Sequence, residues 1–140
     1  MAGNTPPIFS RVGALGGIGS TTLTTATADY TGVSANNILI FTADATNGGF
    51  VQRIRFKAIG TNTASVARIY INNGSTNGTA TNNVFYGEVS LPGTTAINTA
   101  ATVDVDYPLN FVLPPGYRLY AGLGTTVASG WVASVIAGAY

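Results

Sequence analysis

The sequence contains neither cysteine nor histidine among its 140 residues. Without cysteine the chain can form no disulfide bond and no thiolate metal site, and it has no thiol nucleophile. Without histidine it lacks the commonest general base near neutral pH and the commonest metal ligand. Motifs for nucleotide binding and for an activated serine are also missing. We therefore expect a protein that is not an enzyme and that has no catalytic residues, cofactor or metal.

Charged residues are scarce as well, at 8% of the chain, and the net charge is +1. An average soluble domain has roughly 25% charged residues. Surface scaling gives a folded monomer of this size about 6,800 Å² of accessible area, or roughly one charge per 600 Å². The balanced charge predicts no nucleic acid and no membrane as partner. A surface this poor in charge, with a positive mean hydropathy, predicts contacts with other proteins.

The N-terminal residues show no basic region followed by an apolar stretch, so we expect no secretory signal peptide. No run of 18 apolar residues occurs, which predicts no membrane-spanning helix. Pro6 and Pro7 favour an extended backbone and lower the entropic cost of ordering the segment. We expect residues 1–12 to form an extended arm and residues 13–140 to form one domain. The contact residues expected in the arm are Pro6, Pro7, Ile8, Phe9 and Arg11.

Short runs rich in Thr, Val, Ile, Tyr and Phe alternate along the chain with Gly, Asn and Pro. This pattern is typical of an all-β sandwich or barrel. We expect a single-domain antiparallel β-sandwich that is jelly-roll-like, with a closed up-and-down barrel as the alternative. The expected strands cover residues 7–15, 18–27, 37–43, 50–59, 64–72, 83–91, 103–113, 117–124 and 129–138.

Residues 50–58 alternate between apolar and basic side chains, so the apolar positions, Phe50 among them, are expected to share one face. Three positive charges about 6.6 Å apart along the other face can contact an acidic partner. Alternatively, they form a solvated face paired across strands with Glu88 or an aspartate, which is the interpretation we favour. Nucleic-acid binding would require more basic residues and exposed aromatics. The basic residues are Arg53, Arg55 and Lys57.

Two carboxylates, Asp104 and Asp106, share a face of the expected strand 103–113. Paired acids can bind Ca²⁺ or perform glycosidic acid–base chemistry. Calcium needs six to eight oxygen ligands, however, and the five acidic residues are spread over the whole chain. We interpret the pair as solubilising charges that lie opposite arginine residues.

The last expected strand is apolar on both faces, with Trp131 and Val135 on one face and Val132 and Ile136 on the other. Strands of this kind are usually buried on both sides. We therefore expect either a central strand of a sheet or a strand in a subunit contact. Trp131 is accordingly a candidate partner contact.

Four segments carry a resemblance to known proteins: 82–92 (NNVFYGEVSLP), 107–109 (YPL), 113–119 (LPPGYRL) and 130–131 (GW). They resemble small virion proteins of tailed bacteriophages, most of all head-decoration (cement) proteins with β-sandwich folds. The resemblance implies a protein of the phage head, made in the host cytoplasm, that binds the major capsid protein and other copies of itself. For the self-assembly we favour a trimer at local threefold positions over a dimer at twofold positions.

A second functional hypothesis is a receptor- or glycan-binding module of a phage tail or head fibre. Aromatic residues such as Tyr70, Tyr86 or Tyr120 would then stack on sugar rings, and the polar loop 72–83 would be a recognition loop. Copy number separates the two hypotheses, because a shell protein is present in many more copies than a fibre protein.

Overall fold

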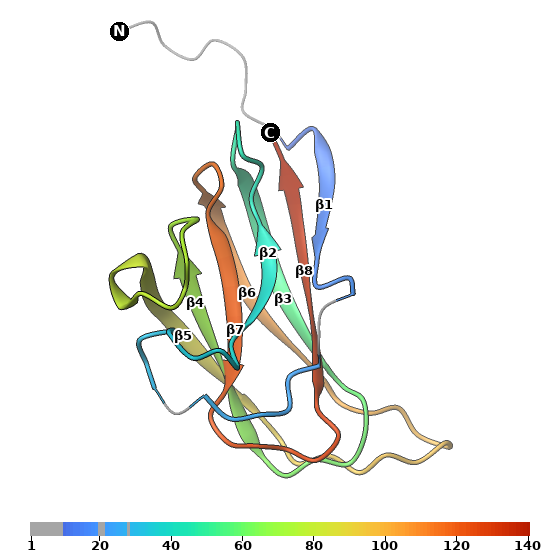
Figure 1. Cartoon of the computed structure of the whole chain (residues 1–140). Coiled ribbons are helices and arrows are strands. Elements are labelled where there is room, and N and C mark those ends of the chain that lie inside the picture. Colours follow the sequence, from blue (N-terminus) through green and yellow to red (C-terminus); the bar gives the residue numbers. More distant parts are fainter. Residues whose placement is uncertain (1–9, 20–21, 28) are drawn as a thin grey trace, which may run out of the picture.

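The structure is a computed structural model that describes residues 10–19, 22–27 and 29–140. In these residues the chain forms two packed antiparallel sheets of four strands each (Figure 1). Among the described residues, no helix has the length and apolar character that crossing a membrane requires. The elements are β1 (Val12–Gly16), β2 (Ile38–Thr42), β3 (Gly49–Ala58), β4 (Ser65–Asn72), the 3-10 helix η1 (Ala80–Asn82), β5 (Asn83–Leu91), β6 (Asp104–Leu113), β7 (Arg118–Leu123) and β8 (Trp131–Ala139).

The order of the strands is that of a jelly roll. One sheet, called sheet A here, has the order β1-β8-β3-β6, and the other, sheet B, has the order β2-β7-β4-β5. Strand 1 pairs with 8, 2 with 7, 3 with 6 and 4 with 5, always antiparallel. This pairing results when a long antiparallel pair of chain segments folds over itself, so that its strands are divided between two sheets. The predicted all-β antiparallel sandwich is confirmed, and the alternative of one closed barrel is wrong.

Eight of the nine expected strands are present in the described residues. The exception is 18–27, where only isolated bridges form, at Leu23 and Ala26. The threonines of this segment have the β-propensity that suggested a strand. However, Gly17 and Gly19 take positive φ and turn the chain away from the edge of sheet A. The segment then joins β7 and the start of β8 through single bridges instead of a ladder.

The core lies between the sheets and consists of their inward-facing side chains. Its largest member, Trp131, is 0% exposed. This corrects the expectation that Trp131 contacts a partner: β8 is an inner strand of sheet A, as one interpretation of the sequence held, and Trp131 points into the core. The other fully buried core side chains include Phe56, Leu23, Ile40, Ile54, Ile69, Leu91, Leu113, Leu119, Leu123 and Val51.

A β-bulge in β3 changes which of its side chains face the core. The pairing of β3 with both neighbouring strands shifts between Val51 and Arg53. Because one extra residue inverts the alternation of side chains, Phe50 lies on the outer face together with Arg53. Ile54 and Phe56 point inward, as expected. The expectation that Phe50 shares their face is wrong.

The described part of the expected N-terminal arm already belongs to the sandwich. The backbone N–H of Arg11 donates to the carbonyl oxygen of Ala139 at 2.8 Å, and Val12 is the first residue of β1. The sheet therefore begins at Val12, one residue before the expected start of the domain, with Arg11 bonded to it. The arm residues Pro6, Pro7, Ile8 and Phe9 lie outside the described residues.

Candidate partner-binding surface

The outer face of sheet B is covered by the chain itself, through the described residues of segment 22–37. The backbone N–H of Thr27 donates to β7 at 2.7 Å, and the guanidinium of Arg68 donates to the carbonyl oxygen of Thr27 at 2.7 Å. The hydroxyl of Tyr70 donates to the carbonyl oxygen of Asp29 at 3.0 Å. Tyr70 points away from the core, yet it is only 1% exposed. The centre of the outer face of sheet B, around Tyr70 and Gly122, is thus covered, whereas Leu39 and Glu88 stay 42% and 43% exposed.

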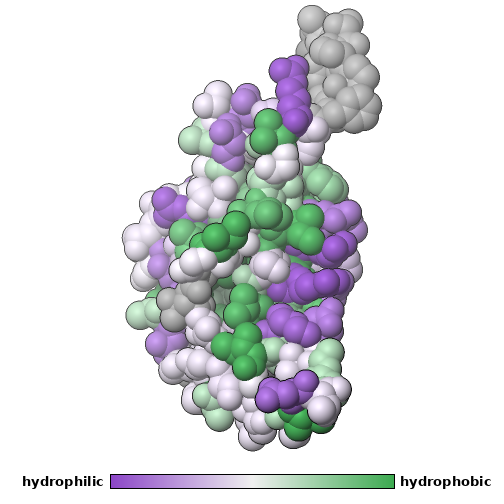
Figure 2. Space-filling view, turned by 90° about the vertical axis from the view of Figure 1, so that its right-hand side faces the viewer, coloured by the Kyte–Doolittle hydropathy of each residue, from purple (hydrophilic) through white to green (hydrophobic). Residues whose placement is uncertain are grey.

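The outer face of sheet A, in contrast, is largely open to solvent in the described part of the chain, although Ser10 lies over the buried Gly138. Its charged side chains are 35–46% exposed, and the apolar residues Leu15 and Val112 are 66% and 55% exposed. Figure 2 looks onto the side that carries β1 and shows hydrophobic residues gathered there beside a column of hydrophilic ones. We call the outer face of sheet A the A face.

Pairing across the strands divides the A face into a charged half and a mainly apolar half. The charged half lies at the end of sheet A where β8 begins, and the apolar half lies at the end where β8 finishes. The charged rows are Val132–Lys57–Asp104 and Ser134–Arg55–Asp106, and the mainly apolar rows are Leu15–Ile136–Arg53–Pro108 and Gly13–Gly138–Phe50–Val112.

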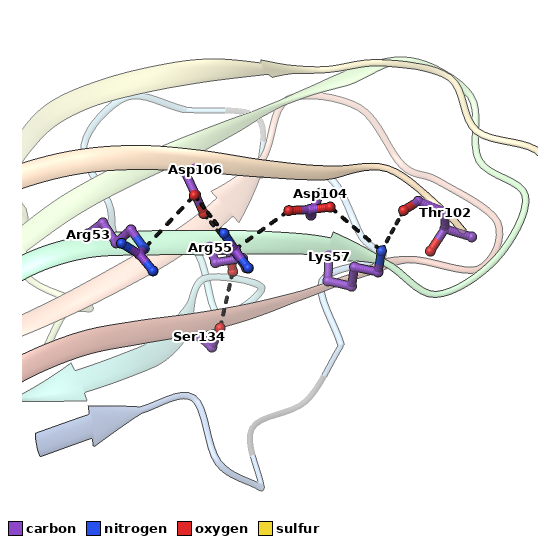
Figure 3. A network of polar contacts seen from close by, with 7 residues as sticks. All are labelled: Arg53, Arg55, Lys57, Thr102, Asp104, Asp106 and Ser134. Carbon is purple, nitrogen blue, oxygen red and sulfur yellow. Dashed lines mark hydrogen bonds and ion pairs between the residues drawn. The ribbon is translucent and has the colours of Figure 1, made fainter. Parts of the chain in front are cut away.

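The charged half is centred on a bidentate pair between Arg55 and Asp106 (Figure 3). Arg55 donates from Nε to Asp106 Oδ1 at 2.7 Å and from Nη2 to Oδ2 at 2.8 Å. This hydrogen bonding holds the pKa of Asp106 below its ordinary value of 3.8. The same contact raises the pKa of Arg55. Planar, bidentate pairs of this kind are stronger and better oriented than a single ion contact.

Two further cations extend this pair into a network along the face. Arg53 Nε lies 3.9 Å from Asp106 Oδ2, and Lys57 Nζ lies 3.8 Å from Asp104 Oδ1. Lys57 also donates to the carbonyl oxygen of Thr102, at the end of the connection that leads into β6 (Figure 3). Three basic side chains of β3 are therefore paired with two carboxylates of β6.

This network confirms the interpretation of the basic stripe that the sequence favoured, namely pairing across strands with aspartates. Glu88, the other partner considered, lies on sheet B, where its Oε2 is 3.6 Å from Arg68 Nε. The interpretation of Asp104 and Asp106 as charges opposite arginine is confirmed by the same contacts. Among the described residues, no group of three or more potential metal ligands comes together.

The structure brings together only some of the expected contact residues. Arg53, Arg55 and Lys57 lie side by side on the A face, whereas Arg11 lies at the outer edge of the same sheet. The apolar half of the face was not found from the sequence. Leu15 and Val112 lie in expected strands, but the sequence did not show which sheet face the chain would leave open.

The aromatic residues expected to stack on sugars are mostly buried. Tyr70 and Tyr120 are 1% and 9% exposed, whereas Tyr86 is 42% exposed. Tyr86 packs against Tyr107 and Phe111, with ring centroids 6.4 and 5.2 Å apart. Tyr86 therefore fills the opening between the edges of β5 and β6 instead of forming a free platform.

The loop 72–83 is polar and largely exposed, as expected, but most of its asparagine side chains bond within the loop, and Asn77 Nδ2 donates to the carbonyl oxygen of Gly32 at 3.3 Å. Asn83 Nδ2 donates to the carbonyl oxygen of Asn77 at 2.7 Å, and Asn72 Nδ2 donates to Asn83 Oδ1 at 2.8 Å. Asn82 Nδ2 donates to the carbonyl oxygen of Thr76 at 2.9 Å. These side-chain amides hold the loop closed through their hydrogen bonds. The amides of Asn72 and Asn83 are fully used in these bonds.

Comparisons with protein families, with curated proteins and with solved structures find no match to this chain. Function is therefore inferred from the residues and the geometry described above. Of these, the contrast between the covered face of sheet B and the open A face is the feature that bears most directly on partners.

Proposed function

We propose that this chain is a structural virion protein of a tailed phage, a decoration (cement) protein that binds and stabilises the major-capsid shell. The observation that carries the proposal is the A face, an open sheet face with an exposed apolar half and an internally paired charged half. A face of this kind suits contact with another protein. Its flat, rigid backbone is held by β1, β8, β3 and β6, so little ordering is needed on binding.

The pairing of the charges supports a protein partner over nucleic acid. Asp106 already occupies the Nε and Nη2 donors of Arg55, so a phosphate would meet a paired guanidinium beside two carboxylates. A protein surface that covers the network leaves the bidentate pair intact, although it must still offset the cost of removing those charges from water. The major capsid protein is therefore the proposed main partner, with other copies of this chain as further partners.

The scarcity of charge and the expected arm support the same function. Jelly rolls occur in both viral capsid and lectin domains, so the fold alone does not select between a shell protein and a fibre module. A shell protein contacts several subunits at once, and simultaneous weak contacts give strong overall binding. Each contact then needs no more than a standard interface of roughly 800 Å² per partner. The burial of Tyr70 and Tyr120 removes two residues on which the glycan hypothesis depended.

The test is to quantify the protein in purified particles, with heads and tails separated, by mass spectrometry against the major capsid protein. We expect it in heads, in a fixed ratio to the major capsid protein that is comparable to one. Recovery only with tails or fibres, in far smaller amounts, would contradict the proposal and favour the receptor-binding alternative.

A matched pair of variants tests whether the A face is the surface that binds the shell. Val112→Arg places a charge on the apolar half of the A face, and Leu39→Arg places one on the outer face of sheet B. Both residues are exposed, at 55% and 42%, so both variants are expected to fold. We expect Val112→Arg to lower occupancy on the particle and Leu39→Arg to leave it unchanged.

A further inference from the structure

The two sheets have four edge strands, and three of these edges carry features that block pairing with another strand. β6 contains Pro108 and the charged Asp106, as well as a register shift. β5 has a register shift next to Tyr86 and carries Glu88. β2 has a register shift at Ile40. Prolines, charges and bulges are the usual means by which edge strands avoid pairing with other chains.

β1, the fourth edge strand, has none of these features. It pairs with β8 over five consecutive residues without a register shift, and its sequence VGALG contains neither proline nor charge. Two of its apolar side chains, Val12 and Leu15, are 65% and 66% exposed. At Gly13, no atom of the described residues other than its two chain neighbours lies within 4 Å of the place where a side chain would begin. Within its five residues β1 is thus regular and uncharged, with Arg11 directly before it; Leu15 and the gap at Gly13 lie on the A face, and Val12 lies on the opposite face.

We propose that β1 binds β1 of a second copy, antiparallel across a twofold axis at Ala14, so that the two A sheets join into one. The inference is independent of the proposed function in the virion. A strand that pairs with itself antiparallel makes the same contact twice, as a twofold interface requires. The joined sheet keeps the antiparallel pairing that every strand of sheet A already has.

The choice of Ala14 as the centre follows from the sizes of its neighbours. With the axis at Ala14, Gly13 of each copy lies opposite Leu15 of the other, and both residues lie on the A face. Side chains directly opposite each other on antiparallel strands are in contact. Each exposed Leu15 would therefore fill the gap that the partner's Gly13 leaves, and the apolar halves of the two A faces would become continuous.

The strand is short, so the dimer is expected to be weak. Five residues on each copy bury considerably less than the roughly 800 Å² per partner of a standard interface. The dimer should therefore appear with increasing protein concentration and should be strengthened when several copies are held together on a larger assembly.

The first test uses single cysteines, which the chain allows because it has no cysteine of its own. Ala14→Cys places two thiols opposite each other at the axis, within the range that a disulfide can bridge. Leu15→Cys is the control, because it is more exposed but is offset from its counterpart. We expect Ala14→Cys to form the disulfide-linked dimer faster under mild oxidation. A faster reaction of Leu15→Cys would indicate random collisions and would overturn the proposal.

The second test is sedimentation equilibrium of the full chain over a wide concentration range. We expect the mean mass to rise from the monomer's 14.3 kDa toward that of the dimer. Leu15→Lys should abolish this rise, whereas Val84→Lys, at an exposed apolar residue of edge strand β5, should not. A monomer at every concentration, or an equal loss in both variants, would overturn the proposal and leave β1 free for a strand of another protein.

Discussion

The outer faces of the two sheets belong to the same jelly roll, but they differ in how far the rest of the chain covers them. Sheet B is covered by the segment between β1 and β2, so that even its outward-facing Tyr70 is buried. Sheet A keeps its outward side chains exposed and pairs its charges within the face. The fold thus uses the outer face of one sheet to pack its own chain and leaves most outward side chains of the other exposed.

The same contrast appears in the glycines on the two faces. A side chain at Gly122, on the outer face of sheet B, would overlap the side chains of Asn37 and Thr27, whereas one at Gly13, on the A face, would meet nothing within 4 Å. The cover on sheet B therefore fits closely enough that a single methyl group disturbs it. Gly13 on the A face accepts the same methyl group, whereas one at Gly138, also on the A face, would overlap the side chain of Ser10.

The largest expected effect comes from removing the side chain that joins sheet B to its cover. Tyr70→Ala should lower the free energy of unfolding by about 3–5 kcal/mol, as for other buried aromatic residues. Tyr70→Phe, which loses only the hydrogen bond to Asp29, should cost about 0.5–1.5 kcal/mol. Urea denaturation measures both. A loss below about 1 kcal/mol for Tyr70→Ala would mean that the cover contributes little to stability.

A smaller effect is expected from the matched glycine variants. Gly122→Ala should lower the free energy of unfolding by about 1–3 kcal/mol, because the new methyl group overpacks the space beneath Asn37. Gly13→Ala should leave it unchanged or raise it by about 0.4–1 kcal/mol, because alanine restricts the unfolded chain. Thermal or urea unfolding of the two variants side by side gives the comparison. Equal changes in the free energy of unfolding for the two variants would contradict the difference in packing between the two faces.

The smallest effect is expected from the ion pairs of the A face, because their side chains are exposed and screened by water. The pKa of Asp106 is lowered in the folded protein. Its contribution to the free energy of unfolding is therefore complete at pH values above the ordinary carboxyl pKa. That contribution disappears as the pH falls through the lowered folded-state value. Asp106→Asn should therefore be slightly destabilising at pH 7 and equal to the unchanged protein in strong acid. A difference in stability between Asp106→Asn and the unchanged protein that persists at the lowest pH would contradict a stabilising role of the ionised Asp106.

The sequence was sufficient to predict the class of fold, because strands such as β6 alternate between core-facing and exposed side chains. The pairing of the basic stripe with aspartates was also predictable, since both sets alternate with apolar residues. Phe50 was placed on the wrong face because an extra residue in β3 cannot be seen in a pattern of period two. The segment 18–27 was taken for a strand because its threonines favour one, whereas positive φ at Gly17 and Gly19 ended β1.

The open A face could not be predicted, because it depends on which sheet the segment between β1 and β2 covers. Trp131 illustrates the same limit. Its strand is apolar on both faces, and only the order of the strands decides that Trp131 points into the core while Val132 and Ile136 face outward. Contact surfaces of this kind are properties of the tertiary arrangement, and strand patterns alone do not contain them.

The most direct measurement for the central claim is a cryo-EM reconstruction of the particle at a resolution that traces the strands. The account predicts the protein on the head, with β3, β6 and β8 of the A face against the major capsid protein and the covered face of sheet B toward solvent. A shell contact made through sheet B and its cover, or a position on the tail alone, would contradict it.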